Sequence, residues 1–459
     1  MESNQIQSIV SKQRKFFSKG NTKSLTFRLE QLNKLKSLVQ HYEEKLTQAV
    51  KEDLGKPPFE TFTGEIGFLI EEINFVLKNL KNWQKPQKVP TPLVFRPAKS
   101  YIYSEPYGIV LIISPWNYPY LLSLSPLIGA IAAGNCAILK PSEVSPKASH
   151  VISEMLSQGF EESFIAIVEG GISESQKLLE QKFDYIFFTG GEFVGKIVME
   201  AASKNLTPVT LELGGKSPCI VDDDIDIDIT AKRITWGKFF NAGQSCVGPD
   251  YLLVSPKNKD LLLKKIKESI QDFFGLDPSQ SPDYGRIINQ KHFNRIKNLL
   301  KDTNIYYGGN FNEKNCYIAP TILHPVTSSE QIMKEEIFGP ILPILEYQNL
   351  DEAFLFIQKR PKPLAAYLFS TDSQNQERFL NEISFGGGCI NDALSHYVNY
   401  HFPLGGVGAS GMGGYHGKFS FETFTHRKTI MKKPLWIDIP FRYPPYKNKL
   451  KFLKKFYGK

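Results

Sequence analysis

The sequence predicts an α/β protein organised around a parallel, Rossmann-type sheet. Short apolar runs rich in β-branched residues occur at 109–113, 137–139, 165–168, 185–188 and 209–211. Helical stretches separate them, around 121–133, 148–158, 173–179 and 194–202. Short apolar strands that alternate with helices are typical of a parallel sheet covered on both faces, which binds ligands at the carboxyl ends of its strands.

The segment before the first strand is expected to be helical and then to leave the body of the protein. Apolar residues recur at helical spacing between Thr26 and Trp83, with a second helix over roughly 61–80. Four prolines between Pro86 and Pro97 then end any helix. Because this stretch still carries apolar residues, we expect an ordered excursion that pairs with the strand-like residues 419–431.

A second α/β unit is expected after residue 214. It contains helical stretches at 229–240 and 258–274, a hairpin-like NIYYGG sequence, and strands near 365–369 and at GGGCIN. A glycine-rich run then precedes the C-terminal strand-like residues.

The amino-acid composition limits the classes of protein to which the chain can belong. Of the 459 residues, 41% are hydrophobic and 22% charged, as in an ordinary soluble globular protein. No apolar run reaches the ~18 residues of a membrane span, and the polar N-terminus lacks the apolar core of a secretory signal. The five cysteines are scattered without a CxxC pair and the eight histidines are dispersed. We therefore expect no disulfide framework and no metal site, and a cytoplasmic location fits.

The net charge of +8 belongs to the C-terminal tail. Residues 427–459 contain eleven Lys and Arg side chains but one acid, Asp438, whereas the rest of the chain is close to neutral. Such a tail argues against a nucleic-acid-binding fold and for a local anionic partner. Leu450, Leu453 and Tyr457 lie on one helical side among lysines, as in a segment that rests on an anionic membrane. A solvated tail packed on a partner subunit is the alternative.

One loop presents a candidate nucleophile. The stretch NAGQSCV, which starts at Asn241, is small and polar, with apolar, periodic sequence on both sides. Gly243 permits a sharp turn, and Cys246 follows among amide and hydroxyl groups. Polar, partly exposed surroundings favour the thiolate of a nucleophilic cysteine, although a plain loop cysteine fits the local pattern equally well.

A candidate general base lies upstream. Glu212 follows the last strand of the predicted parallel sheet and precedes two glycines. An acid held among Val209, Leu211 and Leu213 would have its pKa raised by desolvation, which suits a general base. A solvated glutamate at a strand end is the alternative interpretation.

Polar sequence follows four of the five predicted strands. These stretches are PWN after the first strand, KPSE after the second, TGGEFVG at the fourth and Glu212 at the fifth. The carboxyl ends of parallel strands meet at one edge of the sheet, so these four stretches form the crevice that a cofactor requires.

These motifs together resemble the NAD(P)-dependent aldehyde dehydrogenase superfamily. LELGGKSP and NAGQSCVGPDY occur in that order, with Glu212 and Cys246 34 residues apart. PWNYP, LKPSE, KEEIFGP and PLGGVGASGMGGYHGKFSFETFTHRK match further stretches of the family. The last of these, with VGPDY and RYPPYK, is similar to the class 3 branch, and the resemblance runs from about Phe27 to Tyr446.

The resemblance implies a domain division and a homodimer. Residues 1–84 and 106–213 would form an NAD(P)-binding domain, 214–392 a catalytic domain, 85–105 and 393–432 an oligomerisation sheet, and 433–459 a basic tail.

The resemblance also implies a mechanism. Cys246 would attack the aldehyde to give a thiohemiacetal, whose oxyanion the Asn117 amide and the Cys246 N–H would stabilise. Hydride transfer to the nicotinamide would leave a thioester, and Glu212 would activate the water that hydrolyses it. Tyr118 would line the entrance for the aldehyde, and the many aromatic residues suit an apolar aldehyde of medium or long chain, or an aromatic one.

Cofactor contacts follow from the same resemblance. Lys140 and Glu143 would contact the adenosine ribose, Glu336 would hold the nicotinamide ribose, and Phe338 would lie against the cofactor. A carboxylate at Glu143 disfavours a 2′-phosphate, so NAD is expected first and NADP stays open.

The loop containing Gly190, Gly191 and Gly195 would lie near the pyrophosphate, where a helix N-terminus offers amides. Relatives commonly carry a small hydroxyl residue at position 191, so glycine there puts one phosphate hydrogen bond in doubt.

Other motifs lack the context that their function needs. GGEFVGK is one residue short of a P-loop, and Ile197 stands where a Ser or Thr would bind Mg²⁺. Gly406-x-Gly408-x-x-Gly411 fits a dinucleotide fingerprint but follows no clear strand, so we expect a structural loop beside the active site. The acids at 222–228 lack the glycine and distal glutamate of a calcium loop, and GQS lacks the final glycine of a serine-hydrolase elbow.

Two alternatives to an aldehyde-oxidising enzyme remain on the same fold. One is a catalytically silent relative, which the joint presence of Cys246, Glu212 and Asn117 opposes. The other is an acylating aldehyde dehydrogenase, whose members generally lack the deacylating glutamate.

Overall fold

The computed structural model describes residues 2–457, which form two compact units. The larger contains the residues up to Trp83 together with Pro106–Thr425, and the smaller contains Gln84–Glu105 together with the described residues from His426 onward. Each unit is considered by itself below.

A six-stranded sheet forms the first half of the larger unit, in the order β17-β7-β6-β3-β4-β5. Its strands are β3 (Ile109–Ile113), β4 (Cys136–Lys140), β5 (Ile165–Ile167), β6 (Tyr185–Thr189), β7 (Val209–Glu212) and β17 (Gly411–Met412). The first five are parallel, and β17 runs antiparallel to β7. The predicted parallel α/β fold is therefore confirmed, with each predicted strand within two residues of its observed bounds.

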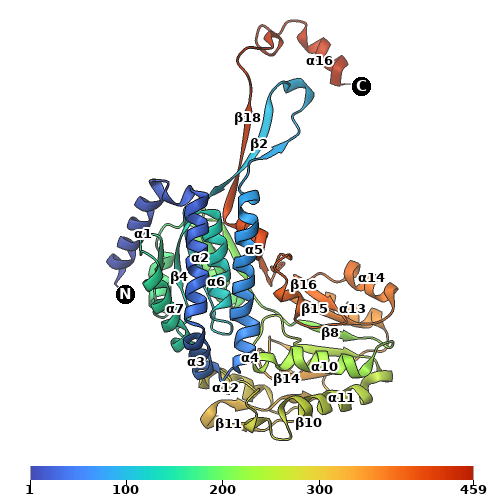
Figure 1. Cartoon of the computed structure of the whole chain (residues 1–459). Helices are drawn as coiled ribbons and strands as arrows, with labels where there is room; N and C mark the ends of the chain where they lie inside the picture. The colour runs from blue at the N-terminus through green and yellow to red at the C-terminus, as the bar shows by residue number, and fades with distance from the viewer. Residues whose placement is uncertain (1, 458–459) are drawn as a thin grey trace. The chain divides into compact units, whose positions relative to one another are not determined.

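Helices cover both faces of this sheet, as alternate residues of β3 show. Val110 and Ile112 belong to one buried cluster, whereas Ile109 and Leu111 belong to another on the opposite face. The helices of this half are α1 (Ser3–Ser18), α2 (Leu25–His41), α3 (Glu43–Leu54), α4 (Pro58–Thr61), α5 (Gly67–Trp83), α6 (Leu121–Ala133), α7 (Pro146–Gly159), α8 (Ile172–Leu179), α9 (Glu192–Ser203) and α15 (Gly417–Thr423). Figure 1 shows α2, α6 and α5 side by side on one face.

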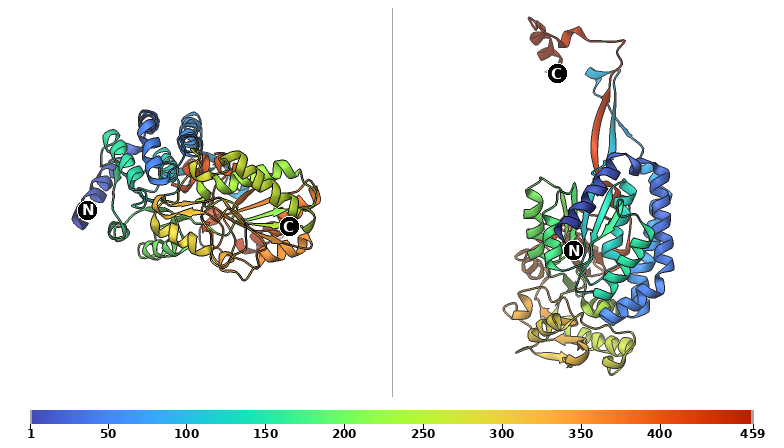
Figure 2. Two further views of the ribbon diagram at one scale, coloured as in Figure 1. Left: turned by 90° about the horizontal axis from the view of Figure 1, so that it is seen from below. Right: turned by 90° about the vertical axis from the view of Figure 1, so that its left-hand side faces the viewer.

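Helix α1 was not predicted, although the sequence contains its signal. Ile6, Ile9, Val10 and Gln13 follow helical spacing and are the buried residues of the helix. The Gln13 side-chain amide donates to the carbonyl of Ala137 at the start of the sheet (2.9 Å), which satisfies a buried polar group. The right-hand view of Figure 2 shows α1 in front of the strands.

A seven-stranded sheet forms the second half of the larger unit, in the order β10-β13-β14-β9-β8-β15-β16. Its strands are β8 (Pro218–Val221), β9 (Tyr251–Val254), β10 (Ile305–Tyr307), β13 (Thr321–Leu323), β14 (Ile341–Glu346), β15 (Ala365–Phe369) and β16 (Gly387–Ile390). Its helices are α10 (Ile227–Phe239), α11 (Pro256–Phe274), α12 (Gln290–Leu299), α13 (Leu350–Gln358) and α14 (Ser373–Glu382). A separate hairpin pairs β11 (Phe311–Asn312) with β12 (Tyr317–Ile318).

The C-terminal end of the larger unit differs from expectation. Residues 393–425 belong to this unit rather than to the small sheet, and the first half of the strand-like stretch 419–431 is helix α15. The buried carboxylate of Glu72 accepts the Gly417 N–H (2.8 Å) at the first turn of α15. A Cβ on Gly129 of α6 would lie 2.5 Å from the Ser420 Cβ, so this glycine admits the helix. Tertiary packing thus overrides the strand preference of the aromatic residues.

The smaller unit is a three-stranded sheet followed by a short helix. Strands β1 (Gln87–Val89), β2 (Lys99–Pro106) and β18 (Thr425–Lys432) lie in that order, which confirms the expected pairing of the proline-rich excursion with the later strand. Lys428 and Glu105 form an ion pair across the sheet (2.7 Å). Helix α16 (Lys449–Tyr457) leaves Leu450 and Phe452 well exposed. Within residues 2–457, no helix combines the length and apolarity that crossing a membrane requires.

Candidate active site

Strand ends of the six-stranded sheet and the cysteine loop line one cavity of about 490 Å³, which we call the Glu212 cavity. Its walls are formed by Pro115, Trp116, Asn117, Leu122, Thr189, Gly190, Gly191, Glu192, Glu212, Leu213, Gly214, Cys246, His292, Arg295, Glu335, Glu336 and Phe338. The ends of β3, β6 and β7 therefore meet there, where the order of the parallel strands reverses and ligands bind such sheets.

The cysteine loop is held in a conformation that few sequences could adopt. Gly243 has φ +71°, and a Cβ there would lie 2.4 Å from the Gly339 carbonyl oxygen. The predicted sharp turn is thus present, and glycine is required for it. The Gln244 side chain ties the loop down, because its Nε2 donates to the Arg286 carbonyl (2.9 Å) and its Oε1 accepts the Ile288 N–H (3.0 Å).

The Cys246 thiol is partly exposed, but its surroundings do not favour ionisation. Burial, and then the nearby carboxylates of Glu336 and Glu212, raise its pKa to about 12. The expectation of a thiolate-favouring loop is therefore wrong for the protein by itself. The sequence shows the polar loop residues, but it does not show that two buried acids from distant segments face the sulfur.

Glu212 is the last residue of β7, and it pairs with Thr189 of β6 on one side and with Gly411 of β17 on the other. Within residues 2–457, neither carboxylate oxygen has a hydrogen-bond partner, although the side chain is buried. Desolvation accordingly raises the pKa of Glu212 well above its ordinary value, which confirms the predicted direction and cause. A buried acid without a protein partner is free to hold and activate a water molecule.

Asn117 is fixed against the cysteine loop by both its side chain and its backbone. Its Nδ2 donates to the carbonyl of Gln244 (3.2 Å), two residues before Cys246. Its own carbonyl accepts hydrogen bonds from the Asn241 amide and the Lys56 ammonium, each at 3.0 Å. Asn117 and Cys246 therefore line the same cavity, as the expected pairing of oxyanion donor and nucleophile requires.

Lys56 belongs to a buried ion pair that sequence analysis missed. Lys56 Nζ lies 2.7 Å from Glu65 Oε1, and both side chains are 0% exposed. The other Glu65 oxygen accepts the Tyr120 N–H (2.8 Å), and the ammonium lies 4.3 Å from the centre of the Tyr118 ring. Glu65 is in the π-helical turn Phe62–Ile66, a distortion that often marks functional sites. Eight residues separate Lys56 from Glu65 in the sequence, and no local motif links the two.

Glu336 and Phe338 lie on the opposite wall of the cavity, on a segment held by Lys216 and Asp250. Lys216 pairs with Asp250 and donates to the carbonyls of Ile332 (2.9 Å) and Glu335 (3.0 Å). Burial and the Asp250 carboxylate raise the pKa of Glu336 to about 8. Lys216 stands in the quoted LELGGKSP motif but received no role from the sequence.

The start of α9 offers space for a phosphate. Gly190 and Gly191 line the cavity, and no atom lies within 4 Å of a Cβ built at Gly191. Gly195 instead packs on Leu213, where a Cβ would lie 2.8 Å from that side chain. The open cradle, the helix N-terminus and the acids on the far wall fit a dinucleotide.

Lys140 and Glu143 lie at the end of β4, outside the residues that line the Glu212 cavity. Lys140 Nζ contacts Glu143 Oε2 (3.1 Å) and the Pro141 carbonyl (2.8 Å). His292 and Arg295 do line the cavity, and both were missed because isolated basic residues on a helix carry no sequence signal. Burial, Arg295 and Lys291 lower the pKa of His292 to about 4, so it is neutral.

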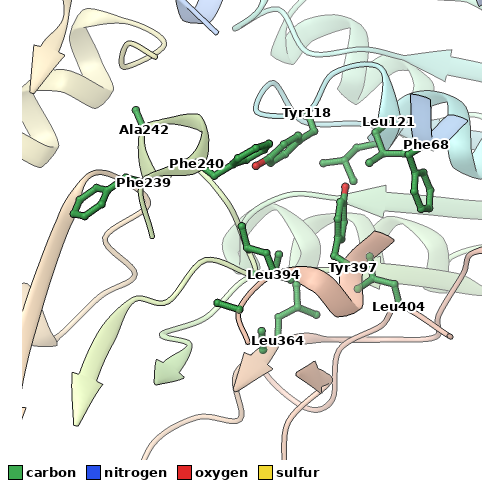
Figure 3. Packing of buried hydrophobic residues seen from close by; sticks show 14 of the residues in the cluster. Phe68, Tyr118, Leu121, Phe239, Phe240, Ala242, Leu364, Leu394, Tyr397 and Leu404 are labelled. Atoms are coloured by element: carbon green, nitrogen blue, oxygen red, sulfur yellow. The ribbon is translucent and has the colours of Figure 1, made fainter. Parts of the chain in front are cut away.

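Tyr118 lines a different cavity, of about 210 Å³, on the other side of the cysteine. This Tyr118 cavity is formed by Thr63, Gly64, Tyr118, Trp236, Phe240, Ser245, Val247, Leu394, Ser395, Tyr397 and Val398. Figure 3 shows the Tyr118 ring reaching toward Phe240, with Leu394 and Tyr397 nearby. Because Ser245 and Val247 flank Cys246 in the chain, both cavities adjoin the cysteine loop.

Comparisons with known proteins identify the family. The Aldehyde dehydrogenase family model matches residues 1–430. The chain is 53% identical over 444 residues to the 4,4'-diaponeurosporen-aldehyde dehydrogenase of Staphylococcus aureus, covering 96% of this chain and 97% of that protein. It is 47% identical to the rat aldehyde dehydrogenase family 3 member A2, covering 95% and 90%. A solved structure described as the substrate-bound state of Staphylococcus aureus AldH superposes with a TM-score of 0.97 at 52% identity, covering 98% and 99%.

The fold and the site thus define an oxidoreductase that acts on aldehydes. The chain belongs to the aldehyde dehydrogenase family, and its relatives place it in the class 3 branch that the motifs predicted.

Proposed function

We propose that this enzyme oxidises an apolar aldehyde, of medium or long chain or aromatic, to the carboxylic acid, with NAD as the first-choice cofactor. One observation carries the proposal. Cys246, Glu212 and Asn117 line a single cavity, and an aromatic cavity is lined by Ser245 and Val247, the chain neighbours of that cysteine.

The residues divide the chemistry between them. The thiol proton leaves to solvent, and the Cys246 sulfur adds to the carbonyl carbon to form a thiohemiacetal. The oxyanion accepts hydrogen bonds from the Asn117 amide and the Cys246 N–H. A nicotinamide cofactor, which Glu336 and Phe338 would hold in this cavity, would supply the hydride acceptor that turns the thiohemiacetal into a thioester. Glu212 then takes a proton from water, the hydroxide adds to the thioester, and the C–S bond breaks to release the acid.

The cofactor residues support NAD over NADP. The cavity wall with Glu336 and Phe338 would hold the nicotinamide half, and the start of α9 would hold the pyrophosphate. Glu143 at the end of β4 is a half-exposed carboxylate that would face the adenosine ribose and repel a 2′-phosphate. A tenfold or larger preference for NADP over NAD in kcat/KM would contradict this assignment.

The aromatic cavity supports an apolar aldehyde. One relative is named 4,4'-diaponeurosporen-aldehyde dehydrogenase, and the other is named aldehyde dehydrogenase family 3 member A2. The walls of the Tyr118 cavity in this chain are built mainly from aromatic and aliphatic side chains, which suit an apolar substrate.

The proposal is tested by NAD(P)H absorbance over a graded series of aldehydes, beside Cys246→Ser and Glu212→Gln. Cys246→Ser is expected to abolish turnover. Glu212→Gln is expected to reduce kcat about 10²–10⁴-fold and to accumulate an acyl adduct on the cysteine, seen by mass spectrometry. Turnover by Cys246→Ser would refute the covalent route. Rapid transfer of the acyl group to coenzyme A by Glu212→Gln would favour an acylating relative.

We further propose a cytoplasmic homodimer that uses the β1-β2-β18 sheet as its oligomerisation element, with the tail resting on anionic membrane. Helix α16 carries lysines beside exposed Leu450 and Phe452, the pattern of an interfacial helix. The test is pelleting with anionic and with neutral vesicles, comparing the full chain with a truncation after Tyr446. Equal pelleting of both proteins would refute membrane contact, and a monomeric mass in solution would refute the dimer.

A further inference from the structure

A third cavity of about 280 Å³ adjoins the Tyr118 cavity. It is lined by Pro57, Phe59, Glu60, Trp236, Phe240, Phe273, Phe274 and Asp283, and we call it the Phe273 cavity. Trp236 and Phe240 belong to the walls of both cavities, so the two are neighbours across these aromatic rings. A path of apolar side chains therefore runs from the cysteine loop to the surface between α4, α10 and α11.

The surface around this path exposes more aromatic area than folding requires. Phe59 is 73% exposed and Trp236 is 42% exposed, although both line the Phe273 cavity. Val398, at the Tyr118 cavity, is 45% exposed. Large apolar side chains gathered around neighbouring cavities are typical of a ligand surface, whereas exposed apolar residues without such a role are usually scattered singly.

We propose that the Phe273 cavity is a distal subsite for the far end of an extended apolar aldehyde whose carbonyl lies at Cys246. The inference rests on the proposed function and specifies its substrate class. An aldehyde that ends within the Tyr118 cavity leaves Phe59 and Phe273 untouched, whereas a longer chain passes Trp236 and Phe240 and covers them. The occupant is the substrate itself because the apolar lining continues from the cavity that flanks the nucleophile.

The charged residues of the subsite restrict the far end of the substrate. Glu60 and Asp283 are both acids. The Asn241 N–H donates to Glu60 (2.9 Å), and burial raises the pKa of Glu60 to about 7, so this carboxyl group is only partly ionised at neutral pH. A second carboxylate at the far end of the chain would face these acids across an apolar pocket. The subsite therefore selects long aldehydes with a neutral end over semialdehydes of the same length with a terminal carboxylate.

The test compares kcat/KM for butanal, octanal and hexadecanal in the natural enzyme, Phe59→Glu and Leu276→Glu. Each methylene that the enzyme buries contributes about fourfold, so hexadecanal should exceed octanal by well over tenfold. Phe59→Glu places a charge in the distal subsite on a residue already exposed, and is expected to lower the hexadecanal-to-octanal ratio at least tenfold. Leu276 is 84% exposed and is absent from the cavity lining, so Leu276→Glu controls for added charge and should preserve the ratio.

Binding provides a readout that does not depend on turnover. Hexadecanol, titrated below its self-association concentration, should change the tryptophan fluorescence of the natural enzyme through Trp236. The change should be lost in Trp236→Phe and should need at least tenfold more hexadecanol in Phe59→Glu and in Phe273→Glu. If both variants bound hexadecanol as tightly as the natural enzyme, or if both kept its hexadecanal-to-octanal ratio of kcat/KM, the distal subsite would be refuted even where butanal is oxidised normally. Failure of every aldehyde with the natural enzyme would instead overturn the proposed function.

The selectivity for a neutral end is tested with the semialdehyde of hexadecanedioic acid. Its kcat/KM should be at least tenfold below that of hexadecanal, and Asp283→Asn should narrow the gap. Equal kcat/KM for the two aldehydes in the natural enzyme would refute the role of the acids.

Discussion

The two cavities that meet at Cys246 differ in almost every physical property. The Glu212 cavity combines acids from three segments with Arg295 and a neutral His292, whereas none of the residues that line the Tyr118 cavity in the described chain carries a formal charge. On the acidic side, burial raises the pKa of Glu212, of Glu336 and of the thiol itself. Under the proposed function, proton chemistry would take place in the Glu212 cavity and apolar recognition in the Tyr118 cavity.

A buried ion pair, Lys56–Glu65, supports the backbone between the two cavities, although neither residue lines a cavity. Lys56 donates to the Asn117 carbonyl and Glu65 accepts the Tyr120 N–H, so the pair holds the backbone on either side of Tyr118. Asn117 and Tyr118 are adjacent residues that line different cavities. One loop can therefore supply an oxyanion donor to one side and an aromatic wall to the other. The following predictions test this division, from the largest expected effect to the smallest.

Removing the buried cation between the two cavities should have the largest effect, on the stability of the fold. Lys56→Met leaves the Glu65 carboxylate buried without its cation, which is expected to reduce the free energy of unfolding by about 3–5 kcal/mol. Urea unfolding measures the loss. Lys45→Met is the matched control, because Lys45 pairs with Glu154 at 2.8 Å while 60% exposed, and such a pair contributes about 1 kcal/mol or less. Similar losses in the two variants would show that the buried pair does not support the backbone between the two cavities.

Removing a polar group from the Glu212 side should cost far more activity than removing one from the Tyr118 side. Asn117→Ala is expected to raise the barrier by about 2.7–4 kcal/mol, seen as a 10²–10³-fold fall in kcat with a small change in the aldehyde KM. Thr63→Ala deletes a hydroxyl from the Tyr118 cavity, one that is bonded to the Phe59 carbonyl (2.8 Å), and should change kcat less than threefold. A fall of tenfold or less in Asn117→Ala would remove the oxyanion role.

The raised thiol pKa predicts a steep pH dependence. With the pKa of Cys246 near 12, the thiolate fraction rises tenfold per pH unit up to at least pH 9. The rate of alkylation by iodoacetamide in the absence of cofactor, followed by the mass of the Cys246 peptide, should rise about a hundredfold from pH 7 to pH 9. In denaturant the rate should level off near the ordinary thiol pKa of about 8.5. A plateau below pH 8 in the folded enzyme would show that the acids do not control the thiol.

The smallest effect is expected at the phosphate cradle. Gly191→Ser fits without displacing an atom and supplies one hydroxyl, so the cofactor KM should fall about fivefold, as for one added hydrogen bond of ~1 kcal/mol. Gly214→Ala is the contrasting variant, because its Cβ would lie 2.4 Å from a Glu336 carboxylate oxygen and should raise that KM. An unchanged KM in Gly191→Ser would place the pyrophosphate away from this residue.

Local pattern was sufficient for most of the architecture. The strands of the parallel sheet, the helices between them and the turn at Gly243 follow from apolar periodicity and glycine placement, which act over a few residues. Where the prediction failed, contacts between residues distant in the sequence outweighed the local pattern. Helix α15 has strand-favouring aromatics, but Glu72 and Gly129, both distant in sequence, supply its first-turn acceptor and its packing surface.

By itself, the sequence determined the family and the parallel sheet, and it predicted the nucleophile, the base and the asparagine, because these residues stand in contiguous motifs. Only the tertiary structure showed the raised pKa of Cys246, the buried Lys56–Glu65 pair, the presence of His292 and Arg295 in the cavity wall, and the two unlike cavities beside one loop. Desolvation and charge proximity depend on distances between segments far apart along the chain, and no local pattern records those distances.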